Sequence, residues 1–328
     1  MKMQKHITIL GGGAWGTALA VLTATLGHHT HIYAREKKTA KEINNRHRNS
    51  RYLPDISLPD TIRATADPQK ALAAADIVLA VIPSQAFGAA LEQLASFVPA
   101  KAPLVLCNKG IEETSGRFMS DVVQDILPYH PLATLSGPSF ARDVAKGLPA
   151  AVTLASRDNS LAHDLAHLLS GRNFRCYAST DLIGVEIGGA LKNVLALTAG
   201  VAAGLKIGAS AQAALVTRGF TELRRIGITL GSKPETMTGL AVLGDIVLTC
   251  SSPQSRNYTY GVALGASQPL TDLPLAEGVA TALVAARLCE KHGIDAPIID
   301  TIAAILSDKM HVEDAMQTLI TRPVKFED

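Results

Sequence analysis

A lysine lies in the middle of an otherwise apolar stretch, where its charge needs a chemical reason. The run "EIGGALKN" (186–193) places Gly188, Gly189 and Lys192 inside a helical pattern that continues with the apolar residues 194–205. Glycine inside a helix costs about 1 kcal/mol relative to alanine, and a buried ammonium needs an anionic partner. All three residues share one helix face. The pattern fits a slot in which a cofactor ring or small substrate meets the ammonium. The alternative is a helix crossing that needs the glycines, with the lysine stem reaching solvent.

A second chemical signature opens the chain. The segment "ILGGGAWGTALA" contains Gly11, Gly13 and Gly16 in the spacing G-x-G-x-x-G, directly after an expected strand and at the start of an expected helix. Such glycines permit a tight turn and a close approach to a pyrophosphate, which the helix N-terminus then binds. In this context we expect a dinucleotide site and not a ligand-free turn.

The end of the second expected strand bears on the choice of dinucleotide. A carboxylate there would bind the ribose hydroxyls of NAD, but "HIYAREKK" has Ala34 followed by Arg35, with Lys37 and Lys38 beyond. An arginine at this point suits a 2′-phosphate. The sequence therefore favours NADP(H), with NAD(H) as the alternative if Glu36 turns inward.

Further polar residues follow two expected strands. Lys109 in "CNKGIE" and the backbone and hydroxyl donors of Gly137 and Ser139 in "LSGPSFA" lie where open parallel sheets bind ligands. Each of these features also occurs in ordinary turns.

The second half of the chain adds a carboxylate and a planar cation. Asp245 and Thr249 are spaced i, i+4 on one helix face, and Arg256 in "SRN" has a guanidinium suited to a phosphate. Asn193, next to Lys192, supplies a neutral donor and acceptor.

These groups need a scaffold, and the apolar pattern supplies one. Short aliphatic runs that alternate with helical patterns predict an α/β fold, an N-terminal Rossmann-type doubly wound parallel sheet followed by an all-helical C-terminal domain. The expected strands are 6–10, 29–33, 76–83, 102–108, 131–137, 150–156 and 173–177. The strand signal stops near residue 181. We therefore expect a dinucleotide-binding domain at 1–180 and a helical substrate and catalytic domain at 181–328.

Composition excludes several other classes of protein. The 328 residues are 47% hydrophobic and 18% charged, with a net charge of +2, which gives no broad basic surface for nucleic acid or anionic lipid. The apolar stretch 194–205 is too short to span a bilayer, and glycines interrupt the signal-like N-terminus. The four scattered cysteines fit a reducing compartment. We expect a cytoplasmic protein without stable membrane insertion.

One motif imitates a metal site. The run "HDLAH" (163–167) places two histidines at i, i+4, but Asp164 stands where a zinc protease needs Glu and no third ligand is obvious. We expect an ordinary helix and no metal.

The motifs, taken together, resemble those of bacterial NAD(P)-dependent glycerol-3-phosphate dehydrogenase. They are "GGGAWGTALA", "NKGIE", "LSGPSFA", "EIGGALKNVLAL", "LVTRG", "LGDIVLTC" and "SRN", in family order over most of the chain. The resemblance implies reduction of dihydroxyacetone phosphate, a triose phosphate, to sn-glycerol 3-phosphate for phospholipid synthesis.

The resemblance also implies residue roles. The lysine matching Lys192 is the general acid–base, and the one matching Lys109 contacts substrate and cofactor. Asp245 orients Lys192, with Asn193 and Thr249 completing the hydrogen bonds. The residues that the resemblance implies at the substrate site are Lys109, Gly137, Ser139, Lys192, Asp245, Ser255, Arg256 and Asn257. The implied cofactor contacts are Gly11, Gly13, Ala14, Trp15, Gly16, Arg35, Lys109, Ala141, Arg256, Leu275 and Glu277.

The chain departs from the family pattern at a few positions near these sites. They are Ser210, Gln212, Tyr258, Thr259 and Val279. Two other functions remain open: another β-hydroxyacid-type dehydrogenase, and a non-catalytic nicotinamide-binding regulator. A homodimer is compatible with the apolar second domain, but the sequence does not decide the oligomeric state.

Overall fold

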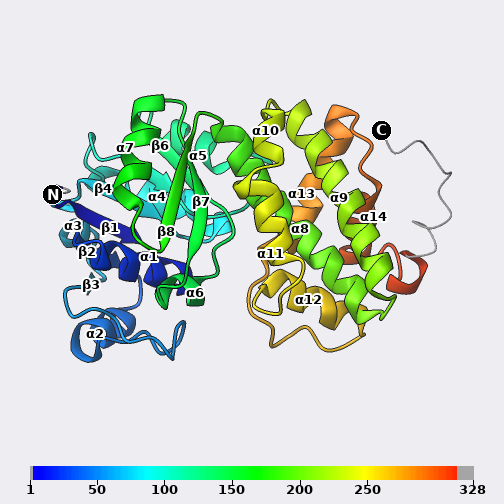
Figure 1. Cartoon of the computed structure of the whole chain (residues 1–328), viewed down its shortest axis with the longest axis horizontal. Helices are drawn as coiled ribbons and strands as arrows, with labels where there is room; N and C mark the ends of the chain where they lie inside the picture. Colours follow the sequence, from blue (N-terminus) through cyan, green and yellow to red (C-terminus); the bar gives the residue numbers. More distant parts are fainter. Residues whose placement is uncertain (1–2, 316–328) are drawn as a thin grey trace. The chain divides into compact units, whose positions relative to one another are not determined.

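The computed structural model describes residues 3–315, which fall into two compact units (Figure 1). The first unit comprises Met1–Gly110 and Arg117–Glu186, and the second Ile111–Gly116 and Ile187–Asp328. We describe each unit by itself.

The first unit is built on an eight-stranded sheet with the order β3-β2-β1-β4-β5-β6-β7-β8. Its strands are β1 (His6–Leu10), β2 (His29–Tyr33), β3 (Arg63–Thr65), β4 (Ile77–Ala80), β5 (Leu104–Leu106), β6 (Leu132–Ser136), β7 (Ala150–Ala155) and β8 (Phe174–Ser179). This order, with β1 and β4 at the centre and crossovers to either side, is that of a Rossmann-type sheet.

One strand pair departs from the expected parallel sheet. β6 and β7 run antiparallel, with Leu135 opposite Leu154, whereas all other neighbours are parallel. The connection 137–149 contains only the five-residue helix α6 (Ala141–Ala145), which is too short to carry the chain back to the other end of the strands. β7 therefore starts at the end of the sheet where β6 finishes. β7 and β8 therefore run opposite to the rest.

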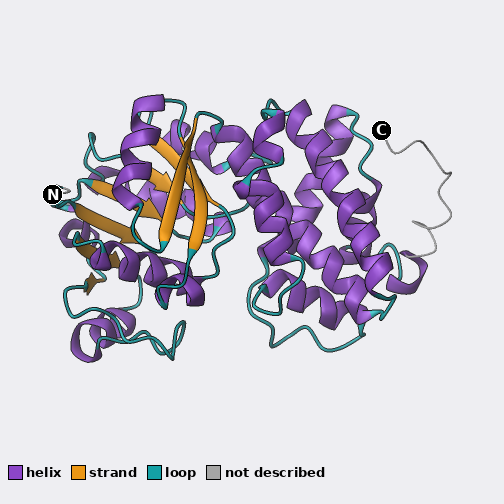
Figure 2. Ribbon diagram, in the orientation of Figure 1, coloured by secondary structure: helices purple, strands orange, loops and turns teal. Residues whose placement is uncertain are grey.

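Apolar side chains alternate between the two faces of the sheet and form a separate core on each. In β4, Ile77 and Leu79 pack into one core while Val78 and Ala80 pack into the other. Helices cover both faces, as expected for a doubly wound sheet (Figure 2). The first core includes residues of α1 (Ala14–Thr25), α2 (Lys37–Arg46), α6 and α7 (Asn159–Leu169). The second includes residues of α3 (Pro68–Leu72), α4 (Ser84–Leu94) and α5 (Met119–Ile126), and the short helix η1 (Ala95–Phe97) follows α4.

Among the described residues after β8, every regular element is a helix. They are α8 (Leu182–Gly204), α9 (Ala209–Thr229), α10 (Pro234–Met237), the π-helix η2 (Leu240–Gly244), α11 (Asp245–Thr249), α12 (Arg256–Gly265), α13 (Glu277–His292) and α14 (Pro297–Leu306). α8 is long and apolar enough to cross a membrane, yet it is mostly buried inside the fold, as a core helix is.

In the second unit, α8 and α12 make a close contact. A Cβ atom at Gly200 would lie 2.1 Å from the carbonyl oxygen of Tyr258, and one at Gly261 would lie 2.1 Å from that of Leu197. Only glycine lets the two backbones approach so closely. The contact places the N-terminus of α12 beside the part of α8 that carries Lys192.

Candidate active site

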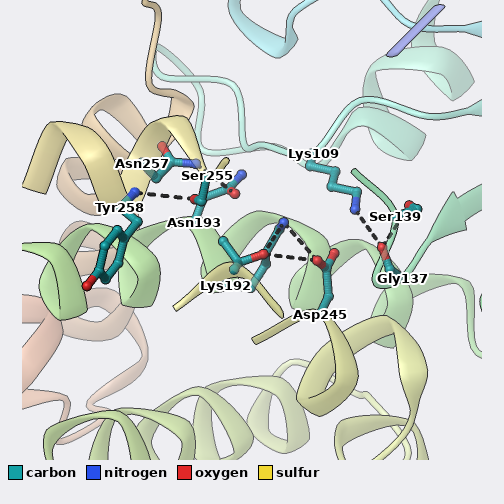
Figure 3. Close-up of polar contacts among 10 residues, drawn as sticks. Lys109, Gly137, Ser139, Lys192, Asn193, Asp245, Ser255, Asn257 and Tyr258 are labelled. Atoms are coloured by element: carbon teal, nitrogen blue, oxygen red, sulfur yellow. Dashed lines mark hydrogen bonds and ion pairs between the residues drawn. The ribbon is translucent and has the colours of Figure 1, made fainter. Parts of the chain in front are cut away.

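The buried lysine of α8 has an anionic partner. Lys192 is 8% exposed, and its Nζ donates to Asp245 Oδ1 at 3.0 Å and to Thr249 Oγ1 at 2.9 Å (Figure 3). Thr249 Oγ1 in turn donates to Asp245 Oδ1 at 3.1 Å. The i, i+4 spacing of Asp245 and Thr249 on α11 therefore produces one closed hydrogen-bonded triangle around the ammonium.

The glycine-slot hypothesis is wrong for Gly188. An added Cβ there would lie 2.3 Å from Val242 Cγ2 and 3.2 Å from the Ala241 carbonyl oxygen, so the position is filled by η2. The glycine permits a tight helix crossing, and that crossing brings Asp245, the first residue after η2, to Lys192. The alternative is therefore correct about the helix crossing at Gly188 but wrong about the lysine, because the ammonium is buried against Asp245 and does not reach solvent.

Two asparagines tie three helices together next to the lysine. Asn257 Nδ2 donates to Asn193 Oδ1 at 2.9 Å, and the Gly278 N–H donates to Asn257 Oδ1 at 2.9 Å. Because the Gly278 N–H can only donate, the oxygen of Asn257 must face it, which fixes the orientation of both amides. Asn193 is thus held beside Lys192 from α12 and α13.

The N-terminus of α12 offers a setting for an anion. Ser255 caps the helix, its Oγ accepting from the Tyr258 N–H at 3.3 Å, and Arg256 is exposed in the first turn. Backbone N–H groups, the positive end of the helix dipole and a guanidinium lie together there. This combination can bind a phosphate.

The first unit brings Lys109 to Gly137 and Ser139. β5 and β6 are parallel neighbours, so the residues that follow them lie at the same edge of the sheet. Lys109 Nζ donates to the Gly137 carbonyl at 3.2 Å, and Ser139 Oγ donates to the same oxygen at 3.0 Å (Figure 3). Gly137 has a φ of 149°, and a Cβ there would lie 2.8 Å from Val152 Cα, so glycine is required.

The glycine turn after β1 has the shape of a pyrophosphate cradle. A Cβ at Gly16 would lie 2.0 Å from the Gly11 carbonyl oxygen, whereas a Cβ at Gly13 would meet nothing within 4 Å. The turn therefore packs tightly on its inner side and is open at Gly13, the N-cap of α1. The indole Nε1 of Trp15 has no partner among the described residues. These features fit a bound dinucleotide.

The structure shows where the Glu36 side chain lies at the end of β2. Ala34 is buried and Arg35 is exposed, while the Glu36 carboxylate accepts from Arg51 Nη1 at 2.9 Å and 3.2 Å. The carboxylate that could have favoured NAD is thus paired with an arginine from the loop before β3.

Both halves of the chain match family models. The model described as the NAD-dependent glycerol-3-phosphate dehydrogenase N-terminus matches residues 6–162, and that of the C-terminus matches residues 181–317. The chain belongs to the NAD-dependent glycerol-3-phosphate dehydrogenase family.

Relatives with the same family assignment match the chain over nearly its full length. The chain is 58% identical to glycerol-3-phosphate dehydrogenase [NAD(P)+] of Brucella canis, covering 99% of this chain and 100% of the relative. It is 54% identical to the Mesorhizobium japonicum enzyme, covering 99% and 95%. The crystal structure of glycerol-3-phosphate dehydrogenase from Coxiella burnetii superposes with a TM-score of 0.93 at 38% identity, covering 97% and 99%.

The remaining residues implied by the family resemblance lie at the starts of helices or in the loop before one. Ala14 and Ala141 begin α1 and α6, and Glu277 begins α13. Leu275 lies just before α13 and is 61% exposed.

Two departures from the family pattern contact each other. Gln212 Nε2 lies 3.5 Å from the Tyr258 hydroxyl and 3.5 Å from the Ala199 carbonyl. Ser210 is exposed near the start of α9, Thr259 Oγ1 donates to the Pro253 carbonyl at 3.0 Å, and Val279 lies in the first turn of α13. In this chain a neutral pair therefore links α9 to α12.

Sequence reasoning missed two polar groups near Lys109. The side-chain amide of Asn108 and the hydroxyl of Ser136 are buried without a hydrogen-bond partner among the described residues. Buried polar atoms without a partner in the protein are rare unless a ligand or a water molecule forms the missing hydrogen bond. The position of Asn108 next to Lys109 at a strand end was the available signal.

The cysteines offer no activated thiol among the three that are buried. Burial raises the pKa of Cys250 and of Cys289 to about 12, and it also raises that of Cys107. Thiols with a raised pKa stay protonated and are poor nucleophiles.

Proposed function

We propose that this protein interconverts dihydroxyacetone phosphate and sn-glycerol 3-phosphate with NAD(P)H, supplying glycerol 3-phosphate for phospholipid synthesis in the cytoplasm. The observation that carries the proposal is the buried triangle of Lys192, Asp245 and Thr249, in a chain that matches the glycerol-3-phosphate dehydrogenase family over both halves. All four cysteines are free, which suits a reducing compartment.

The glycine turn and the start of α1 would hold the dinucleotide. Gly11, Gly13 and Gly16 would cradle its pyrophosphate, and Ala14 and Trp15 would line the first turn of the helix. When bound, the reduced nicotinamide supplies a hydride. Arg35 would contact the 2′-phosphate, and the pairing of Glu36 with Arg51 removes a competing carboxylate. We therefore favour NADP(H), with NAD(H) as the weaker cofactor.

Lys192 would move the proton. In the reducing direction its ammonium donates a proton to the oxygen of the substrate's central carbonyl, and in the reverse direction the amine takes it back. Asp245 and Thr249 both accept from Nζ, so they fix the direction in which its third N–H points. A catalytic group that is held in the correct orientation lowers the activation barrier of the reaction.

The other polar residues would bind the two ends of the substrate. Arg256, Ser255 and Asn257 at the start of α12 would hold the phosphate, and Asn193 would bind a substrate oxygen. Lys109, with Ser139 at the Gly137 turn, would contact substrate and cofactor. Binding energy from the phosphate then positions the reacting carbonyl.

A substrate panel tests the proposal. The purified protein is mixed with NADPH, and oxidation is followed by near-ultraviolet absorbance with dihydroxyacetone phosphate, dihydroxyacetone, and a set of short β-keto and 2-keto acids. We expect turnover with dihydroxyacetone phosphate and at least about a hundredfold loss in kcat/KM without the phosphate, since a charge-assisted phosphate site contributes several kcal/mol. Preference for a keto acid would indicate a β-hydroxyacid-type dehydrogenase. NADPH binding without turnover on any compound would indicate a regulator.

A further inference from the structure

The segment between α2 and β3 reaches the dinucleotide cradle through one buried side chain. Its apolar residues Leu53, Ile56 and Leu58 are buried in the first core, and the Leu58 N–H donates to the His47 carbonyl at 2.8 Å. Asn49 is the polar residue of this segment that is buried, at 1% exposure. A buried amide in an apolar segment needs partners, and its partners identify what it does.

Asn49 bridges the two ends of the glycine turn. Its Nδ2 donates to the Gly12 carbonyl at 2.9 Å and to Thr17 Oγ1, in the first turn of α1, at 2.8 Å. The Gly12 oxygen can only accept, so the NH₂ group of Asn49 must face it and the amide cannot be flipped. The backbone carbonyl of Asn49 accepts from the N–H groups of Tyr52 at 3.1 Å and Leu53 at 2.9 Å, whereas its side-chain Oδ1 is buried without a partner among the described residues.

The Gly12 carbonyl belongs to the same peptide plane as the Gly13 N–H. In a trans peptide these two groups point in opposite directions, so a donor that holds the carbonyl also aims the N–H away from itself. The side of Gly13 is open, since an added Cβ would meet nothing within 4 Å. Asn49 therefore sets the direction of an N–H group at the open side of the turn, where an anion would bind.

We propose that Asn49 is a positioning residue for the cofactor's pyrophosphate, acting through the Gly12–Gly13 peptide and Thr17. The proposal rests on the proposed function, because it assigns the turn to NADPH. It predicts that Asn49 contributes to cofactor affinity without contacting the cofactor. A purely structural Asn49 would contribute to stability alone.

The test compares Asn49→Ala and Asn49→Asp with Asn44→Ala. Asn44 is a matched control: it joins α2 to β3 in the same unit by a pair of bonds to Ala64, both 2.8 Å, away from the glycine turn. For each protein the Kd for NADPH is measured by its fluorescence, together with steady-state constants and the midpoint of urea unfolding. We expect both Asn49 variants to weaken NADPH binding and raise its KM by about tenfold or more, because the turn loses two hydrogen bonds. The kcat at saturating NADPH and the KM for dihydroxyacetone phosphate should change by less than about threefold.

Asn49→Asp should be the more severe, since it places an oxygen against the Gly12 carbonyl while keeping the side-chain volume. If Asn49→Ala does not fold, Thr17→Val removes one of the two acceptors without changing shape and should weaken NADPH binding by about threefold. Asn44→Ala should lower the unfolding midpoint and leave NADPH affinity unchanged. Asn49 or Thr17 variants that bind NADPH as tightly as Asn44→Ala would overturn the inference alone. A wild-type protein that does not bind NADPH would instead overturn the proposed function.

Discussion

Lys192 keeps its position because Asp245 accepts a hydrogen bond from it in a setting with little solvent. The two side chains are 9% and 2% exposed, so neither charge is well hydrated. For such a pair the desolvation cost is offset mainly by the mutual attraction, and removing one partner leaves an uncompensated buried charge. A substitution of either residue should therefore lower the stability of the fold as well as the activity.

We therefore expect Asp245→Ala to lower the free energy of unfolding by about 3–5 kcal/mol, the cost of an unpaired buried charge. The double variant Lys192→Met, Asp245→Leu removes both charges and should lose less. Urea unfolding followed by far-ultraviolet circular dichroism of the helices measures both. A double variant that is less stable than Asp245→Ala would contradict this description of the pair.

The pairing of Glu36 with Arg51 leads to a prediction on cofactor choice. Arg51→Ala releases a carboxylate near the ribose end of the cradle, which would repel a 2′-phosphate and could bind a ribose hydroxyl instead. Since exposed ion pairs contribute up to about 1 kcal/mol, we expect the preference for NADPH over NADH to fall roughly two- to fivefold. Ratios of kcat/KM for the two cofactors measure it, with Arg46→Ala, which removes an exposed arginine at the end of α2, as control. An unchanged ratio would show that Glu36 does not face the cofactor.

At this scale, sequence patterns grouped residues that the structure brings together where those residues are close in the chain or follow an expected strand. The i, i+4 spacing identified Asp245 and Thr249, and the ends of β5 and β6 identified Lys109 and Ser139. Asn49 was missed because its partners, Gly12 and Thr17, come from a distant segment. No local spacing reports a contact of this kind.

At the scale of elements, the α8–α12 contact positions the N-terminus of α12, where we propose that the substrate phosphate binds. A Cβ at Gly261 would lie 2.1 Å from the Leu197 carbonyl, a fixed backbone atom, so Gly261→Ala must push the helices apart. We expect a loss of about 1–3 kcal/mol in stability from overpacking, and a raised KM for dihydroxyacetone phosphate as Arg256 and Asn257 move. Urea unfolding and steady-state kinetics test this. A Gly261→Ala variant with an unchanged KM for dihydroxyacetone phosphate would show that the helix contact does not position the substrate site.

The apolar pattern predicted most elements but not all of their relations. Runs such as 6–10 and 29–33 became β1 and β2 with the same bounds, because both are short and carry β-branched residues at positions that the fold buries. β3 escaped notice because "RAT" is too short and polar to stand out. The reversed direction of β7 depends on the length of α6, and the role of Gly188 depends on η2, neither of which a local pattern reveals.

At the scale of the whole molecule, each unit contains a glutamate whose carboxyl group is removed from solvent without a basic partner in its hydrogen bonds among the described residues. Burial raises the pKa of Glu186 in the first unit and of Glu222 in the second from 4.5 to about 7. Glu186 accepts from the Ser120 N–H at 2.9 Å, with Asp121 and Arg157 as the nearby charges. Glu222 accepts from the N–H groups of Ile298 and Ile299 at the start of α14, with Arg225 and Asp300 nearby.

These raised values predict a pH dependence of stability. The folded state holds these protons more tightly than the unfolded state, so the contribution is present in full below pH 4.5 and is lost as pH rises through about 7. Burial lowers the pKa of His31 and His130, which acts in the opposite sense, so the test compares variants with wild type. Glu186→Gln and Glu222→Gln should each gain stability relative to wild type between pH 5 and pH 8, by about 1–3 kcal/mol. Differences that stay constant across this range would mean that neither carboxyl titrates there.

The central claim is that Lys192 transfers the proton, and one comparison tests it most directly. NADPH oxidation by dihydroxyacetone phosphate is measured for wild type, Lys192→Met and Lys206→Met, the last removing an exposed lysine that follows α8. The Kd for NADPH is measured for each. We predict that Lys192→Met loses about a hundredfold to ten-thousandfold in kcat while binding NADPH as wild type does, because a positioned acid contributes that much, and that Lys206→Met is unaffected. A Lys192→Met enzyme that turns over within tenfold of wild type would contradict the claim and assign the proton to another group.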